Sequence, residues 1–244
     1  MFSSSYVWMA LPAVVMLLGG VLTFFWHPAK QTISLVQHFA AGIILAVLAV
    51  EVFPEINHKH APNHLLLITF ATGALFMFGL KLFGDHLEKS AEDKIATSET
   101  AVAKGLNYGF IMTVFVDAAM DGLTIGAGFA AGANVGFALA LGLSVEMLFL
   151  GMSLISDSLK GRRMLFISVA LSLTILTTAL LGYKLLAGAS DGTVAIALTF
   201  SAAALLYLVS EELLIEAHEV EESPFSALVL FAGFTAFWGL QLFS

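Results

Sequence analysis

Eight long apolar runs constrain this chain more than any other feature of its sequence. A helix that crosses a bilayer needs about 20 predominantly apolar residues, and each run comes close to that length. The runs are continuous and do not alternate, which favours helices over strands. We therefore predict an all-α polytopic membrane protein, a single transmembrane domain over residues 1–244, with spans at residues 6–26, 32–53, 64–83, 106–132, 134–156, 164–187, 193–214 and 225–243.

Composition excludes several other classes. Only 11% of the residues are charged, against about 25% in soluble domains, and the spans leave only short connections. The lipid bilayer is therefore an expected partner and nucleic acid is not. The absence of cysteine excludes disulfides, iron–sulfur clusters and thiolate zinc sites, so any metal must be held by oxygen or imidazole.

Basic residues predict the orientation, because short cytoplasmic connections are enriched in Lys and Arg. One side of the predicted membrane receives only Lys59 and Lys184. We therefore expect a cell-membrane protein with both termini extracytoplasmic and a polar, mobile cytoplasmic linker at residues 85–104. The basic residues assigned to the cytoplasmic side are Lys30, Lys81, Lys89, Lys94, Lys104, Lys160, Arg162 and Arg163.

The second and seventh spans share a weak internal repeat. At an offset of 161 residues, Glu51 aligns with Glu212 and Glu55 with Glu216, together with three apolar matches. The two spans cross in opposite directions, so the match predicts an inverted repeat of three helices, a central pair and three helices, as in many transporters. Chance similarity between apolar helices is the alternative, and it explains the apolar matches better than the glutamates.

Six carboxylates fall inside the spans, where each charge costs about 2.5 to 3.5 kcal/mol at mid-bilayer. Asp117 and Asp121 are one helical turn apart and share a face. Lys81 and Lys184 lie near span ends, where they can snorkel to the interface. Protons or bound cations must then compensate the acids; the alternative for each acid is a protonated group hydrogen-bonded to a neighbouring helix. The six are Asp117, Asp121, Glu146, Glu51, Glu211 and Glu212.

Other polar features leave two interpretations open. Glu211 and Glu212 point about 100° apart on a helix, and we favour Glu212 as the inward residue. His58, His60 and His64 form either a soft-metal collecting site or an exposed loop. Residues 216–222 form either an acidic acceptor for an outgoing cation or a solvated loop, and we expect His38 at the interface.

Several motifs resemble those of the ZIP (Zrt/Irt-like) divalent metal transporters, along most of the chain. Residues 117–126, Asp-Ala-Ala-Met-Asp-Gly-Leu-Thr-Ile-Gly, resemble the family's fourth-helix pattern His-Asn-x-x-Asp/Glu-Gly-x-x-x-Gly. Residues 38–55 look like its second helix and residues 207–218 like its penultimate helix. The resemblance implies a 3+2+3 bundle, a binuclear metal centre between the fourth and fifth helices, uptake toward the cytosol by alternating access, and a homodimer.

The chain also departs from the family pattern. Asp117 and Ala118 stand at the family's His-Asn positions, and of the fifth-helix pattern His-Glu-x-Pro-x-Glu only Glu146 remains as a ligand. By the resemblance, Asp121 is the bridging carboxylate, Asp117 a ligand of the first metal, and Glu146 with Glu212 ligands of the second. Carboxylate in place of imidazole makes the site harder and favours manganese, Fe(II), magnesium or calcium relative to a His-rich site, although zinc also accepts carboxylates. Zinc, manganese or Fe(II) is the expected ion, and zinc specificity is not implied.

These observations together predict a divalent cation transporter and not an enzyme. Its ion is expected at Asp117, Asp121 and Glu146, with Glu212, Glu51 and Glu211 as further candidates. A non-transporting ZIP-like sensor or scaffold is the main alternative, because the fifth-helix motif is eroded. An intramembrane metal-dependent hydrolase is the weakest reading, since the spans contain neither HExxH nor a Ser/His/Asp set.

Overall fold

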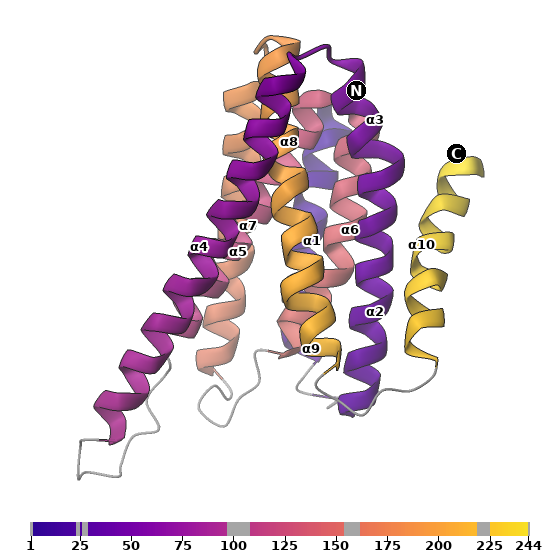
Figure 1. Cartoon of the computed structure of the whole chain (residues 1–244). Helices are drawn as coiled ribbons and strands as arrows, with labels where there is room; N and C mark the ends of the chain where they lie inside the picture. Colours follow the sequence, from indigo (N-terminus) through magenta and orange to yellow (C-terminus); the bar gives the residue numbers. More distant parts are fainter. Residues whose placement is uncertain are drawn as a thin grey trace.

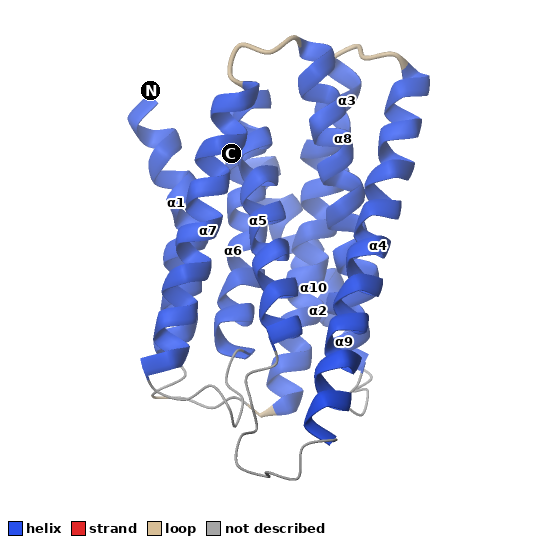
Figure 2. Ribbon diagram, turned by 90° about the vertical axis from the view of Figure 1, so that its left-hand side faces the viewer, coloured by secondary structure: helices blue, strands red, loops and turns tan. Residues whose placement is uncertain are grey.

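The computed structural model describes residues 2–22, 25, 29–96, 108–153, 162–218 and 225–243. Every regular element among these residues is helical (Figure 2). Eight helices are long and apolar enough to cross a membrane. The prediction of an all-α chain with eight candidate spans is thus confirmed.

Two of the spans contain a short π-helical turn, labelled η. The segment α2, η1 and α3 runs without a break, and so does the segment α8, η2 and α9. The elements are α1 (Phe2–Leu22), α2 (Lys30–Val47), η1 (Leu48–Val52), α3 (Phe53–His58), α4 (Asn63–Ala96), α5 (Tyr108–Ala131), α6 (Ala133–Ser153), α7 (Arg162–Leu186), α8 (Asp191–Leu208), η2 (Val209–Leu213), α9 (Leu214–His218) and α10 (Ser226–Phe243).

The helices form one upright bundle with both ends of the chain at the same end (Figure 1). The spans built on α2, α5, α6 and α8 are mostly buried, whereas α4 and α10 are mostly exposed. The main packing pairs are α5 with α7, α1 with α6, α2 with α10, and α4 with α8. The exposed faces of the outer helices are apolar, as expected for surfaces that meet lipid.

Glycines allow the closest of these helix contacts. A methyl group on Gly122 or Gly126 of α5 would overlap backbone atoms of Ile175 or Ala179 in α7. Gly19 of α1 and Gly151 of α6 meet in the same way. Small residues at helix interfaces let the two backbones approach closely. The van der Waals contacts made in this way are a main source of stability between helices in lipid.

The helix α4 differs from the sequence prediction. The predicted span is confirmed, since the apolar part of the helix ends at Gly84, but α4 continues as a helix to Ala96, where we expected a linker from residue 85. The reason is local: residues 85–96 contain Leu, Glu, Lys and Ala and no glycine or proline, so their helix propensity is high although they are polar. The remaining residues of the predicted linker, 97–104, lie outside the described part of the chain.

Candidate metal centre

Three carboxylates from two packed helices converge inside the bundle. Asp117 and Asp121 lie one turn apart on α5, and Glu146 faces them from α6. One oxygen from each lies within 4.8 Å of the others. Asp121 and Glu146 are buried, and Asp117 is half-buried. We call these three residues the carboxylate triad.

The triad has the dimensions of a site for one hard cation. Oxygen ligands on opposite sides of an ion at about 2.4 Å would lie about 4.8 Å apart, so one ion can reach all three carboxylates after small side-chain rotations. Aspartate and glutamate oxygens suit Mg²⁺, Ca²⁺ and Mn²⁺, and zinc and iron also accept them.

Asp121 has a buried carboxylate oxygen, Oδ2, that no hydrogen bond in the structure satisfies. The charges of Glu146 and Glu212 act on this carboxylate. A desolvated carboxylate beside two other acids is costly unless a proton or a cation joins them. The chemistry of the triad therefore calls for a positive charge at this position.

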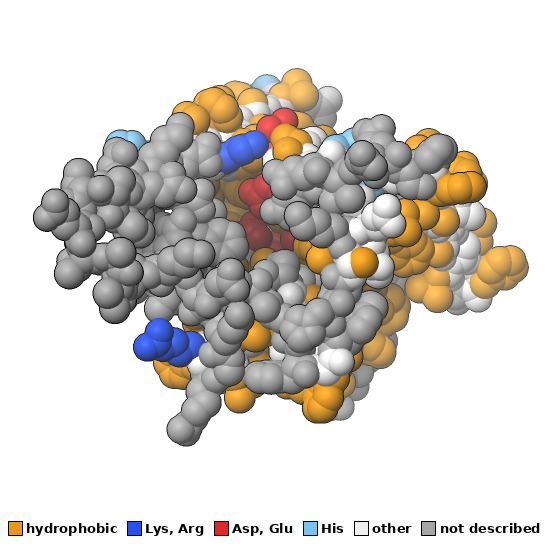
Figure 3. Space-filling model, turned by 90° about the horizontal axis from the view of Figure 1, so that it is seen from below, with side chains coloured by type: hydrophobic (Ala, Val, Ile, Leu, Met, Phe, Trp, Pro, Cys, Tyr) orange, Lys and Arg blue, Asp and Glu red, His pale blue; other side chains and the backbone are white. Residues whose placement is uncertain are grey.

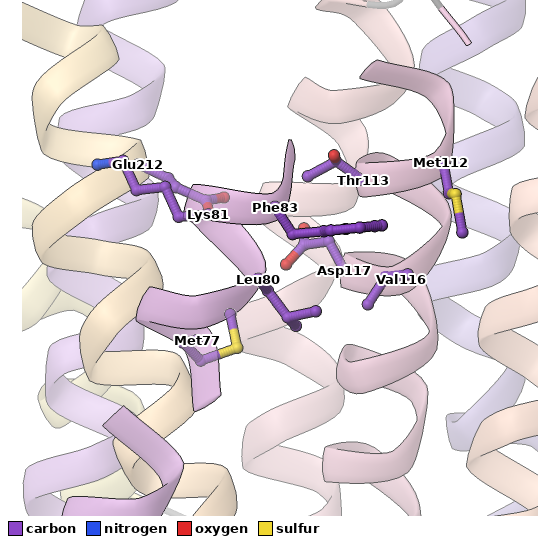
Figure 4. Close-up of a pocket in the computed structure, with 9 residues that line it drawn as sticks. All are labelled: Met77, Leu80, Lys81, Phe83, Met112, Thr113, Val116, Asp117 and Glu212. Carbon is purple, nitrogen blue, oxygen red and sulfur yellow. The ribbon is translucent and has the colours of Figure 1, made fainter. Parts of the chain in front are cut away.

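A pocket leads to the triad from the end of the bundle where α4 and α9 finish. Its polar lining includes Asp117, Glu212 and Lys81, and Figure 4 shows the Asp117 side chain in the space between α4 and α5. Seen from this end, acidic side chains lie at the bottom of a hollow beside a basic one (Figure 3). We call it the acidic pocket; its other lining residues are Met77, Leu80, Phe83, Met112, Thr113 and Val116.

The remaining predicted acids lie outside the triad. Glu212 lines the acidic pocket, whereas its neighbour Glu211 forms an ion pair with Lys81, with Nζ 3.1 Å from Oε2. Glu51 is buried in η1, outside the acidic pocket and the triad, and hydrogen-bonds the Gln241 side chain of α10. The structure therefore brings together three of the six candidates, places Glu212 beside them, and does not place Glu51 or Glu211 with them.

Two other side chains differ from the sequence prediction. Lys81, expected to snorkel to the interface, does lie near the end of the span at Gly84, but its side chain lines the acidic pocket and pairs with Glu211. His38, expected at the interface, is buried against His218, with ring centroids 5.1 Å apart. The helix-forming residues after Gly84 were the sequence signal that the helix continues past Lys81.

The histidines near the α3–α4 turn do not form a comparable centre. His58, His60 and His64 are exposed, and among the described residues the triad is the one group of three or more metal-binding side chains close enough to share an ion. Of the acidic segment 216–222, residues 219–222 lie outside the described part of the chain, so its role stays a prediction.

No protein-family model matches the chain, and no curated protein matches it.

Proposed function

We propose that the protein is a divalent metal cation transporter of the ZIP type. The observation that carries the proposal is the carboxylate triad. It contains a buried Asp121 oxygen that lacks a hydrogen-bond partner, and its Asp117 lines the acidic pocket, which opens at one end of the bundle. Acids inside membrane spans are expensive and mark ion pathways. The ion is the cargo, bound by Asp117, Asp121 and Glu146, with Glu212 next on the path.

We infer that the bundle is a 3+2+3 inverted repeat. The helices α2 (Lys30–Val47) and α8 (Asp191–Leu208) are offset by 161 residues at both ends, and the same offset relates η1 (Leu48–Val52) to η2 (Val209–Leu213). Packing supports the same relation, because α10 packs on α2 as α4 packs on α8, and α1 on α6 as α7 on α5. Such repeats suit alternating access to a central site.

The proposed direction of transport is toward the cytosol. The acidic pocket opens at the end of the bundle where α4 finishes, which is the end that carries most of the basic residues of the chain. By the positive-inside rule this end is cytoplasmic. We therefore propose that the described conformation is open to the cytosol. A homodimer remains a prediction from the resemblance.

Uptake into proteoliposomes tests the proposal. We expect saturable entry of one or more of Mn²⁺, Fe²⁺ and Zn²⁺, and at least a tenfold loss with Asp121→Asn, which keeps the shape and removes the charge. Asp191→Asn, at an exposed carboxylate far from the triad, serves as the matched control and should transport normally. Affinity should also rise from pH 5 to pH 8, because the ligands must lose protons to bind metal.

The outcomes separate transport from the second candidate, a metal sensor or scaffold. That candidate is favoured by one observation, namely that α6 supplies only Glu146 to the triad. Metal binding lost with Asp121→Asn but no flux in the wild type would select the sensor. Normal saturable uptake by Asp121→Asn would refute both readings of the triad.

A further inference from the structure

Lys81 places a positive charge at the wall of a pocket whose other lining residues are two acids, one threonine and apolar side chains. It lies on α4, shares the acidic pocket with Asp117 and Glu212, and its ammonium reaches the η2 turn. There it donates to the Glu211 carboxylate at 3.1 Å and to the Glu211 backbone carbonyl at 3.3 Å. Its side chain is 33% exposed, so the charge is partly removed from water.

The position of Lys81 gives its charge an effect on any ion in the pocket. Figure 4 shows Lys81 and Glu212 on one side of the space and Asp117 on the other. Lys81 forms part of the pocket wall opposite Asp117, so a cation that moves between the triad and the open end of the pocket passes along a wall that carries this charge. Repulsion between charges in such a partly buried site is screened much less than on an open surface.

We propose that Lys81 is a tethered cation that weakens metal binding in the acidic pocket and so promotes release of the ion at this end. The inference rests on the proposed transport function and deepens it. Without a positive charge at the wall, the triad and Glu212 would hold a divalent ion tightly and release it slowly. Glu211 holds the ammonium at the pocket wall, so that it opposes the ion without occupying the triad.

A different role for Lys81 makes the opposite prediction. If the ion pair only clamps α4 onto α8, removal of either partner loosens the pocket, and both substitutions weaken metal binding. If Lys81 acts through its charge, the two substitutions change affinity in opposite directions. Lys81→Met removes a positive charge from the pocket wall, and Glu211→Gln removes the negative charge that pairs with it.

The test is equilibrium binding of Mn²⁺ to the purified full chain, with free Mn²⁺ measured by electron paramagnetic resonance. We expect Lys81→Met to lower the Kd about tenfold, a change within the range for one unit charge near a divalent ion. Glu211→Gln should raise the Kd, and the double variant should return close to the wild type. Lys81→Arg should keep the wild-type Kd, as should Lys184→Met, the control at an exposed lysine near another helix end.

Transport gives a second measurement that a clamp would not reproduce. In proteoliposomes, Lys81→Met should lower KM for Mn²⁺ and also lower the maximal rate, because binding tightens and release slows. A Kd that is unchanged or higher in folded Lys81→Met, as judged by size-exclusion profile and unfolding temperature, overturns the proposal. Binding in the wild type that Asp121→Asn does not alter removes the triad as the site and the Lys81 inference with it, whereas intact triad binding with no Lys81 effect leaves the proposed function standing.

Discussion

Two kinds of helical turn hold the acidic side chains. Asp117 and Asp121 stand in regular α-helix, where a spacing of four residues keeps them on one face. Glu51 and Glu212 stand in the π-helical turns η1 and η2. A π-turn inserts one residue, which rotates the following positions by about 100° relative to an unbroken helix. The spacing of a regular helix therefore predicts the direction in which the aspartate side chains point, but it does not predict this direction for Glu211 and Glu212.

A second ion-pair network lies at the opposite end of the bundle, around Lys59. Its ammonium lies 3.0 Å from Asp191 Oδ1, which joins the end of α3 to the start of α8, and 3.3 Å from Glu55 Oε1. Burial by itself would lower the pKa of Lys59, but hydrogen bonds to Asp191 and Glu55 and their charges raise it above its ordinary value. The charged form is therefore more favourable in the folded protein than in the unfolded chain.

This shift predicts a pH-dependent contribution to stability. Because the folded pKa is the higher one, the stabilisation is fully present below about pH 10, the unfolded lysine pKa, and is lost as the pH rises through the folded value. Lys59→Met should cost about 1 kcal/mol at pH 8, measured as a lower unfolding temperature in detergent, and the difference should shrink above pH 11. Lys184→Met is the control; a Lys59 effect that grows with pH would contradict the assignment.

At the scale of the helices, close backbone contacts fix how α5 sits on α7 beside the triad. Gly122 follows Asp121 directly, and Gly126 lies one turn further. Both approach the α7 backbone near Ile175 and Ala179. The glycines therefore set the position of the helix that carries two of the three triad carboxylates.

Substitution at Gly126 should test this packing. A Cβ there would overlap the Ala179 carbonyl oxygen and the Tyr183 backbone nitrogen, which cannot move aside as a flexible side chain can. We expect Gly126→Ala to cost about 1 to 3 kcal/mol and to reduce metal uptake. Gly132→Ala provides the matched control, since a Cβ at Gly132 meets nothing within 4 Å. Equal unfolding temperatures for the two variants would show that α7 does not constrain α5.

Patterns within one helix predicted more than contacts between helices. Length and hydropathy identify all eight candidate spans, and the turn spacing on α5 puts Asp117 and Asp121 together. The pairing of Lys81 with Glu211 and the burial of His38 depend on which helices pack together and on where α4 ends. Apolar periodicity contains little information about either, because almost every position in these helices is apolar.

At the scale of the whole molecule, the packing departs from the proposed repeat most clearly at one pair of helices. The helix α4 packs on α5, but its proposed counterpart α10 makes no comparable contact with α6 among the described residues. In Figure 1, α10 stands at the edge of the bundle beside α2. An inverted repeat whose halves differ has one end more open than the other, which is what alternating access requires of a single conformation.

The absence of native cysteine makes the proposed orientation directly measurable. His58→Cys and His86→Cys each introduce one thiol at an exposed position, toward opposite ends of the bundle. A membrane-impermeant maleimide applied to intact cells should label the His58→Cys variant at once and the His86→Cys variant only after permeabilisation. The unsubstituted chain should stay unlabelled. The reverse pattern would invert the orientation, and with it the proposed direction of transport.

The continuity of α4 has a practical consequence for observing the protein at work. One unbroken helix carries Lys81 at the wall of the acidic pocket and runs on to Ala96, well past the apolar part of the span. A continuous helix transmits rotation and tilt along its axis with little loss, since each turn is hydrogen-bonded to the next. A small tilt of α4 at the pocket would therefore become a larger displacement at its polar end. A fluorophore attached there would report this displacement from the aqueous side of the membrane.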